Sequence, residues 1–384
     1  MALEDRIAFI KRIEEIRGST VICYLTSLRP NISSQISQDA VRVFFDHLMQ
    51  LPSRPVDKLD IFLCSNGGDG TVPWRLVALF REYGTSFNVL IPYRAYSAAS
   101  LIALGADEIV MHPFAELGPI DPSVSNEFNP THPATGQPLA ISVEDVTAYV
   151  NFIKTTVGIT HEDELVKAIE ILAEKVHPLA LGNVERFLTQ SRMIARKILR
   201  THMSEENSHT IDEIVENMAS KLYFHGHPIN RKEAKDELHL KVVKPEPNLE
   251  GAMWDLYREY EAEFKNTEIF SPASDLAALP AAAPQFIPQN QGMPGMPQQA
   301  LVVSQTSPEM EYELLLATIE SNRLSSMYTL KKRFQLLPFA QIGQQMIKQD
   351  DLAQGWTHSP VPTPGQQAQP SLTSAEGAPQ GGTE

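Results

Sequence analysis

Residues 59–83 read LDIFLCSNGGDGTVPWRLVALFREY, an apolar run followed by a glycine-rich turn and an amphipathic pattern. Leu59–Cys64 has the length and composition of a buried β-strand, and apolar side chains recur at helical spacing through Val72–Tyr83. The glycines between them allow a tight turn and a close approach of the backbone to a ligand. The stretch therefore predicts a strand, a turn and a helix in succession.

The same alternation of strand and helix patterns extends over the first 120 residues or so. Further strands are predicted at Thr20–Leu25, Phe87–Ile91 and Glu108–Met111, and another helix at Gln38–Leu51. Strands that alternate with helices are typical of a parallel sheet with crossover helices. Because the pattern from 143 to 264 is mainly helical, we expect an α/β fold with added C-terminal helices.

Length, charge and cysteine content limit the classes of function. The chain has 384 residues, 42% of them hydrophobic, which is enough for a substantial core. Its net charge of −15 repels nucleic-acid phosphates and anionic bilayers, so we expect neither as a partner. Cys23 and Cys64 each lie in an apolar run, which fits buried free thiols in a reducing cytoplasm. We find no signal-peptide pattern and no run of about 18 apolar residues that could span a membrane.

The composition changes near Pro272. Of the 28 prolines, 13 lie after residue 270, among Gln, Ala, Gly and Ser. This composition is typical of a linker or tail, so we predict one folded domain over 1–270 and a Pro/Gln-rich disordered tail over 271–384. Apolar residues at roughly helical spacing in 309–339 predict a helix there. That helix either docks on a protein partner or is a weakly helical stretch without one.

Two loops could carry chemistry, because each follows a predicted strand and precedes a predicted helix. In Tyr93–Leu101, Ser97 could present its hydroxyl at the carboxyl edge of the sheet, an arrangement suited to acyl transfer. The alternative role for Ser97 is a helix N-cap. In Ser65–Gly70, Gly67 and Gly68 could supply N–H groups for an oxyanion hole beside Ser97. The alternative for these glycines is a purely structural turn, since the loop lacks the spacing of dinucleotide and P-loop sites.

Several motifs together make the pattern specific. They are Ser-x-Gly-Gly at 65–68, Ala-x-Ser-Ala-Ala-Ser at 95–100, Ala-Asp-Glu-Ile-Val-Met at 106–111, Leu-Gly-Pro-Ile-Asp-Pro at 117–122, and longer stretches at 177–184 and 223–234. In this order they resemble the serine dehydrogenase proteinase family, relatives of ClpP and signal peptide peptidase A. The resemblance covers about residues 15–245 and leaves the tail outside.

The resemblance implies a fold, an activity and a set of site residues. The fold is a ClpP/crotonase-like spiral of β-β-α units, and the activity is that of a serine endopeptidase acting on a peptide or protein substrate without a cofactor. Ser97 matches the nucleophile, and Gly67, Gly68 and the N–H of Ala98 match the oxyanion-hole segment. Relatives with this fold form closed oligomers, so a homo-oligomer is expected.

The general base does not follow from the family pattern. A ClpP-like histidine would fall near Ile120, and a lysine of the signal-peptide-peptidase type near Ile141, but the sequence has neither there. We favour His225 as the base, with a loop histidine that stabilises a turn as the alternative. Lys154, on the helix predicted over 143–157, is a second candidate.

His227, His112 and Asp121 also lie in or near the motifs. His227 is a third candidate base, while His112 fits better as a residue that packs or caps a strand end. Asp121 could orient a histidine or could accept backbone N–H groups in a structural turn. His225 and His227 have no Cys-x-x-Cys or His-Glu-x-x-His companion, so no metal site is predicted.

Two other classes of function stay open at this point. One is a catalytically silent ClpP-like oligomeric scaffold that binds partners through its tail. The other is a crotonase-type enzyme acting on an acyl-CoA thioester, which would use the same oxyanion arrangement. A crotonase-type enzyme would usually need a carboxylate poised over the substrate and no nucleophilic serine, so the motif around Ser97 favours the peptidase.

Overall fold

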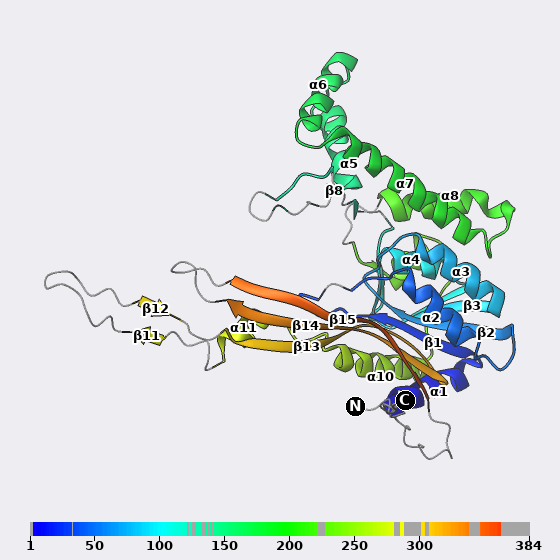
Figure 1. The fold of residues 1–384 in the computed structure, drawn as a ribbon. Helices are drawn as coiled ribbons and strands as arrows, with labels where there is room; N and C mark the ends of the chain where they lie inside the picture. The colour runs from blue at the N-terminus through cyan, green and yellow to red at the C-terminus, as the bar shows by residue number, and fades with distance from the viewer. Residues whose placement is uncertain are drawn as a thin grey trace, which may run out of the picture.

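The computed structural model describes residues 3–32, 34–120, 123–124, 128–132, 136, 139, 141–221, 227–279, 285–287, 301–303, 307–337 and 346–361. Its main sheet has eight strands in the order β10-β5-β3-β2-β1-β13-β14-β15 (Figure 1). The strands from β10 to β1 are parallel, and β13 to β15 continue the sheet in antiparallel fashion. The predicted α/β class with a parallel sheet is confirmed.

The strands of the main sheet are β1 (Thr20–Thr26), β2 (Val56–Cys64), β3 (Gly84–Ile91), β5 (Glu108–Met111), β10 (Val242–Val243), β13 (Glu309–Ser321), β14 (Leu324–Leu337) and β15 (Met346–Pro360). The smaller sheets are β4-β6-β9 (Arg94–Ala95, Glu116–Leu117, Ile229–Asn230), β7-β8 (Ser123–Val124, Ile141–Ser142) and β11-β12 (Gln285–Ile287, Leu301–Val303). All four predicted strands are present within a few residues of their expected ends.

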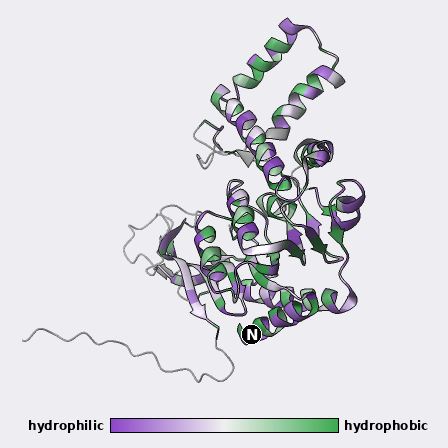
Figure 2. Ribbon diagram, turned by 90° about the vertical axis from the view of Figure 1, so that its right-hand side faces the viewer, coloured by the Kyte–Doolittle hydropathy of each residue, from purple (hydrophilic) through white to green (hydrophobic). Residues whose placement is uncertain are grey.

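Helices cover both faces of the main sheet. On one face lie α2 (Asp39–Leu48), α3 (Val72–Tyr83), α4 (Ala98–Leu104), α7 (Pro178–Leu199) and α8 (Ser208–Glu216). On the other face lie α1 (Leu3–Arg17) and α10 (Pro247–Phe264). Alternate residues of β1 explain this arrangement, because Ile22 and Tyr24 pack on the first face while Val21 and Cys23 pack on the second. Figure 2 shows the hydrophobic residues gathered in the sheet and on the helix sides against it.

The other helices are α5 (Val143–Asn151), the π-helix η1 (Phe152–Thr156), α6 (Glu162–Ala173), the 3₁₀ helix η2 (Glu205–Asn207), the π-helix η3 (Asn217–Lys221), α9 (Arg231–Asp236) and α11 (Pro272–Ala277). Helices α5 and α6 project away from the sheet (Figure 1).

The repeating unit is a strand of the main sheet followed by a short strand of the β4-β6-β9 sheet. β3 leads through β4 into α4, and β5 leads into β6. Ser65, just after β2, forms a bridge with Ala95 of β4. These β-β-α turns bring the ends of β2, β3 and β5 to one side of the molecule, where the motif-bearing loops lie.

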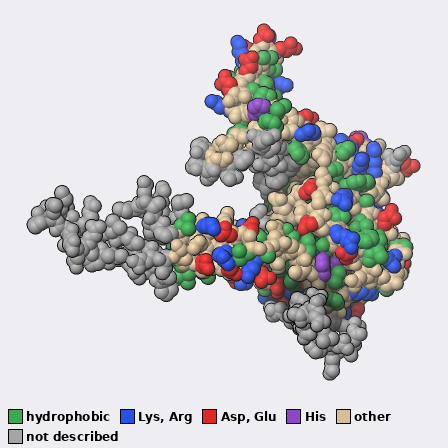
Figure 3. Space-filling model, viewed as in Figure 1, with side chains coloured by type: hydrophobic (Ala, Val, Ile, Leu, Met, Phe, Trp, Pro, Cys, Tyr) green, Lys and Arg blue, Asp and Glu red, His purple; other side chains and the backbone are tan. Residues whose placement is uncertain are grey.

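The helix predicted in 309–339 is wrong, because these residues form β13 and β14. Side chains of even number, Leu314, Leu316, Phe334 and Leu336, are buried against Phe270 and Leu276. On the opposite face at the outer ends of the two strands, Glu311 pairs with Lys331 and Arg333. The buried side chains thus recur at every second residue, the period of a β-strand and not of a helix. Figure 3 shows acidic and basic side chains mixed over these strands.

The prediction of a disordered tail is also wrong for the described part of 271–384. β13 pairs with β1, with Tyr24 opposite Ile319, and so satisfies the hydrogen-bonding groups along that edge of β1. The boundary at residue 270 does not separate this part of the tail from the main sheet, which uses strands from both sides of it.

Buried charges fix the β13–β14 turn on the side of α1 and α10. The guanidinium of Arg6 donates to Glu320, with an Nε to Oε2 distance of 2.9 Å, and both side chains are almost fully buried. The Tyr260 hydroxyl donates to the same carboxylate at 2.8 Å and the Ser325 hydroxyl at 2.7 Å. With a second bond from Arg6 Nη2 to Oε1 at 2.9 Å, each carboxylate oxygen accepts from two donors, as a buried charge requires.

On the side of α2, the same turn is held by a neutral network. The two ring nitrogens of His47 lie 3.2 Å from Ser321 Oγ and 3.0 Å from Ser326 Oγ. The Ser326 hydroxyl also lies 2.9 Å from Nδ1 of His358 on β15. Burial, with a smaller contribution from His358, lowers the pKa of His47 to about 4, so its ring is uncharged at neutral pH.

Candidate functional site

Ser97 lies between β4 and α4 in a backbone conformation that serine rarely adopts. Its φ is 51° and its ψ is −114°, and it occupies the position before the first residue of α4. A serine at a helix N-cap normally accepts a hydrogen bond from a backbone N–H, but the Ser97 side chain makes no such bond. The alternative role of an N-cap is therefore not realised. Backbone strain of this kind occurs preferentially at functional sites.

Ser100, three residues further on, has a structural role instead. It is fully buried, and its Oγ lies 2.7 Å from the carbonyl oxygens of both Ala95 and Gly118. The same oxygen accepts a hydrogen bond from the Gly118 N–H at 3.1 Å. These bonds join β4, α4 and the end of β6, and so hold the turn that carries Ser97.

Gly67 lies directly against the Ser97 turn. Its φ is +97°, and a Cβ at this position would lie 2.6 Å from the Tyr96 carbonyl oxygen and 3.0 Å from the Ala98 nitrogen. Only glycine allows the backbone of residue 67 to come this close to the Ser97 turn with a φ of +97°. The Gly67 N–H donates to Ser65 Oγ at 3.0 Å, and that hydroxyl is itself 2.7 Å from Thr26 Oγ1. The N–H of Gly67, expected in the oxyanion hole, is thus already engaged.

Gly68 lines the same pocket as Ser97. The Ile36 N–H donates to the Gly67 carbonyl at 2.8 Å, and the Asp69 N–H donates to the Ile36 carbonyl at 2.9 Å. Backbone groups point alternately to the two edges of an extended strand. Because the Gly67 carbonyl and the Asp69 N–H point toward Ile36, the Gly68 N–H points to the edge away from Ile36. Within the described part of the chain, neither the Gly68 N–H nor the Ala98 N–H has a hydrogen-bond acceptor.

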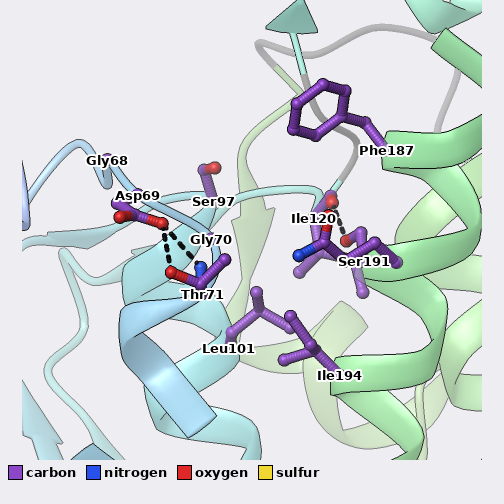
Figure 4. Close-up of a pocket in the computed structure, with 11 residues that line it drawn as sticks. Gly68, Asp69, Gly70, Thr71, Ser97, Leu101, Ile120, Phe187, Ser191 and Ile194 are labelled. Atoms are coloured by element: carbon purple, nitrogen blue, oxygen red, sulfur yellow. Dashed lines mark hydrogen bonds between the residues drawn. The ribbon is translucent and has the colours of Figure 1, made fainter. Parts of the chain in front are cut away.

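A pocket with a volume of about 250 Å³ opens between these loops and α7 (Figure 4). Its apolar lining comes from Leu101, Ile120, Phe187 and Ile194, and the Phe187 ring is 41% exposed at the opening. Ser191, also in the lining, donates its hydroxyl to the Ile120 carbonyl at 2.6 Å. The pocket can therefore accept an apolar side chain next to Ser97.

Asp69 supplies negative charge to the same pocket. Oδ1 accepts hydrogen bonds from the Thr71 N–H at 2.8 Å and from its hydroxyl at 2.6 Å, and Oδ2 accepts one from Gln38 at 3.1 Å. Partial burial works against the charged form, but these hydrogen bonds together hold the pKa of Asp69 below its usual range. Asp69 is therefore a carboxylate at neutral pH and is already occupied by its donors.

The expected general bases do not all fall within the described residues. His225 and Asp121 lie outside them. His227 is described, and its Nε2 lies 2.8 Å from Glu233 Oε1, at the beginning of α9. Its ring is not part of the lining of the Ser97 pocket.

The structure places Lys154 and His112 away from the Ser97 pocket. Lys154 is exposed on η1 and lines a separate pocket between α5 and α6. The His112 Nδ1 accepts a hydrogen bond from the Phe114 N–H at 3.2 Å, and its ring stacks on Trp254 at 5.1 Å. Burial lowers the pKa of His112. This histidine caps the end of β5 and packs against α10, the role that the sequence favoured for it.

Metal ligands, membrane spans and reactive thiols are the other features that could define a site. The described residues contain no group of three or more His, Cys, Asp or Glu side chains that could hold a metal ion. In the same ranges, no helix is both long and apolar enough to cross a membrane. Cys23 and Cys64 are buried free thiols, and burial raises the pKa of both, that of Cys64 to about 12. Neither is a reactive nucleophile.

Comparison with known proteins agrees with these features. Residues 1–135 match the model of the family described as ClpP-like SDH-type serine proteinase. The resemblance carried by the motifs is thus confirmed over that range, which includes Gly67, Gly68 and Ser97.

Relatives and solved structures align with about two thirds of the chain. Two uncharacterized proteins of Methanocaldococcus jannaschii align with 66% of this chain: MJ1495 is 26% identical over 260 residues (76% of its length), and MJ0137 is 24% identical over 261 residues (79%). Among solved structures, a mutant of the 1510-N membrane-bound stomatin-specific protease is similar with a TM-score of 0.36 at 13% identity. That match covers 60% of this chain and 82% of the other.

Sequence reasoning missed the wall of the pocket formed by α7. Phe187, Ser191 and Ile194 follow one another at intervals of four and three residues, which places them on one side of a helix. The signal was present, but nothing in the sequence alone indicates that this side faces Ser97 rather than another part of the core.

Proposed function

We propose that the protein is a serine endopeptidase in which Ser97 is the nucleophile. The Ser97 Oγ attacks the carbonyl carbon of a peptide bond, and the Gly68 and Ala98 N–H groups donate to the oxyanion of the tetrahedral intermediate. The observation that carries the proposal is the Ser97 turn itself, a serine with positive φ whose hydroxyl makes no capping bond and which shares a pocket with Gly68, while the Gly68 and Ala98 N–H groups have no acceptor among the described residues. Gly67 supports the turn by contact and not as a donor.

The chemistry also requires a base that takes the Ser97 proton and returns it to the leaving amine. We assign this role to His225, in keeping with the sequence argument. The acyl-enzyme is then hydrolysed when the same base takes a proton from water, which releases the carboxylate product and restores the Ser97 hydroxyl. The apolar pocket beside Ser97 would hold the substrate side chain next to the scissile bond.

The test is covalent labelling with a fluorophosphonate, read by intact mass. Wild type should gain one adduct, and Ser97→Ala should gain none. Ser191→Ala is the matched control, because Ser191 lines the same pocket but its hydroxyl is bound to the Ile120 carbonyl, so this variant should label like wild type. Equal labelling of Ser97→Ala would contradict the proposal.

The base is tested separately with His225→Ala and His225→Asn. Both should slow the labelling of Ser97 by at least about 100-fold, the lower end of what a positioned base contributes. Matched changes at Lys154 should leave the labelling rate unchanged, because that side chain lies in the pocket between α5 and α6. If both His225 variants are labelled at the wild-type rate, His225 is not the general base.

A second candidate function is a catalytically silent scaffold that binds partners through residues 271–384. It is favoured by one observation, namely that no histidine or lysine lines the Ser97 pocket among the described residues. A folded wild-type protein that takes up no fluorophosphonate would support it.

Homo-oligomerisation in the cytoplasm belongs to the same proposal. Val166, Ile169 and Ile171 on the projecting α6, and Leu179 on α7, are large apolar side chains with 44–59% of their surface exposed. Such side chains are usually covered by another chain. Light scattering on the purified protein should give a mass that is a multiple of 42.7 kDa, and a monomer would contradict the expectation.

A further inference from the structure

The segment 34–39 lies between the C-terminal strands and the glycine loop, and it is bonded to the strands at both of its ends. The Trp356 Nε1–H of β15 donates to Asp39 Oδ2 at 2.6 Å. The Ser34 hydroxyl donates to the Leu316 carbonyl of β13. The Trp356 ring also packs against Tyr328 of β14, with 5.3 Å between the ring centroids.

The same segment is bonded to the glycine loop beside Ser97. Ile36 is fully buried, and its N–H and carbonyl bind the Gly67 carbonyl and the Asp69 N–H, on either side of Gly68. Next to it, Gln38 Nε2 donates to Thr71 Oγ1 at 2.7 Å and to Asp69 Oδ2 at 3.1 Å. The orientation of the Gly68 N–H thus depends on where this segment lies.

The middle of the segment is not packed tightly on the strands. A cavity of about 220 Å³ separates them there, lined by Tyr24, Gln35, Ser37, Ala317, Gln354 and others. Ile36 is buried in the core and the Ser37 backbone bonds to the Tyr24 side chain of β1, while the bonds at the two ends tie the segment to β13 and β15. Trp356 donates to Asp39, which directly follows Gln38, whereas Ser34 lies four residues before Gln38.

We propose that Trp356 is a positioning residue for the Ser97 site. It acts through Asp39 and Gln38 on residues 66–71, and so fixes the Gly68 N–H in the direction of the developing oxyanion. The C-terminal strands are in this sense part of the site, although none of their side chains lines its pocket. The catalytic consequence rests on the proposed function, whereas the effect on the loop does not.

The experiment compares Trp356→Phe with wild type by hydrogen–deuterium exchange of the amides in 66–71. The substitution keeps an aromatic ring but removes the N–H donor. Exchange of the Asp69 amide should become about fivefold faster, the factor that corresponds to one hydrogen bond of ordinary strength. Thr357→Val is the control, because Thr357 is the next residue of β15 and its hydroxyl bonds only to the Met327 carbonyl.

Rescue by a conservative change separates positioning from a general loss of structure. Asp39→Asn keeps a side-chain oxygen that can accept from Trp356 and should retain most of the protection, whereas Asp39→Ala should behave like Trp356→Phe. Unchanged exchange in 66–71 in the Trp356 variant overturns the proposal. So does an equal gain in exchange throughout the main sheet, which would indicate general destabilisation.

Fluorophosphonate kinetics test the link to the site. In Trp356→Phe the maximal rate of Ser97 labelling should fall about fivefold, while the reagent concentration at half-maximal rate should not change, because the Gly68 N–H acts mainly on the transition state. Faster loop exchange with unchanged labelling would overturn the catalytic part. A wild type that does not label at all, with the exchange effect present, would contradict the peptidase function and leave the positioning role intact.

Discussion

The Ser97 turn and the β13–β14 turn both lie against the main sheet, but they are fixed by different forces. The Ser97 turn is held by neutral hydrogen bonds from Ser100 and by the close approach of Gly67. The β13–β14 turn has, besides the neutral His47 network, a buried ion pair between Arg6 and Glu320. The first arrangement is local and is visible as a motif, whereas the second joins residues 314 positions apart and leaves no local signature.

The largest effect is expected where the buried charge is removed. Glu320→Gln keeps the shape of the side chain but deprives Arg6 of its main counter-charge, and should lower the free energy of unfolding by about 4 kcal/mol. Urea unfolding measures it. Glu313→Gln, an exposed change on the same strand, should alter stability by less than about 0.5 kcal/mol. Similar small losses for both variants would show that the β13–β14 turn is not fixed by charge.

The close approach of Gly67 gives the next effect. Gly67→Ala places a methyl group 2.6 Å from the Tyr96 carbonyl at a φ of +97°, and should cost about 3 kcal/mol and abolish fluorophosphonate labelling. Gly70→Ala is the matched control, since a Cβ at Gly70 meets no atom within 4 Å. If both glycines tolerate alanine equally, the contact between the glycine loop and the Ser97 turn is not as tight as described.

The two serines of the turn should separate stability from reactivity. Ser100→Ala removes the buried hydroxyl that the Ala95 and Gly118 carbonyls share, while the Ala95 carbonyl keeps its bond from the Gly118 N–H, and it should lower stability by about 2 kcal/mol. Ser97→Ala removes a hydroxyl that makes no capping bond and should change stability by less than about 0.5 kcal/mol while ending labelling. Thermal unfolding and labelling on the same samples provide the comparison. A large loss of stability in Ser97→Ala would mean that its hydroxyl is structural after all.

The smallest effect concerns His47 beneath the β13–β14 turn. Its pKa is about 4 in the folded protein, against an ordinary value of 6.5 in the unfolded chain. The unfolded chain therefore binds the proton first, and the stabilisation that is complete above pH 6.5 is lost as the pH falls toward 4. Between pH 7.5 and 5.5, wild type should lose about 1.4 kcal/mol more than His47→Gln. Parallel pH profiles in urea unfolding would contradict this.

The sequence was most informative where structure depends on neighbouring residues. The apolar runs around Cys23 and Cys64 predict β1 and β2, and the serine and glycines of the motifs predict which loops meet at the edge of the sheet. The engagement of the Gly67 N–H by Ser65 could not be predicted, because it depends on the exact backbone path between two strands.

The C-terminal strands were missed for a physical reason. Leu314, Leu324 and Met327 fit a helical spacing about as well as an alternation of two, and the surrounding Pro and Gln residues resemble a tail. The free edge of β1 and the buried groups of Arg6 and His47 also favour strands for these residues, and all of these lie some 300 residues earlier in the chain.

The pairing of β1 with β13 has a consequence for biosynthesis. At a translation rate of about 5–20 residues per second, the roughly 300 residues between the two strands take about 15–60 s to make. During this interval a nascent chain exposes the edge of β1, and Arg6 lacks its fully buried counter-charge Glu320. Such an edge invites pairing with other chains, so the newly made protein depends on protection that the completed one no longer needs.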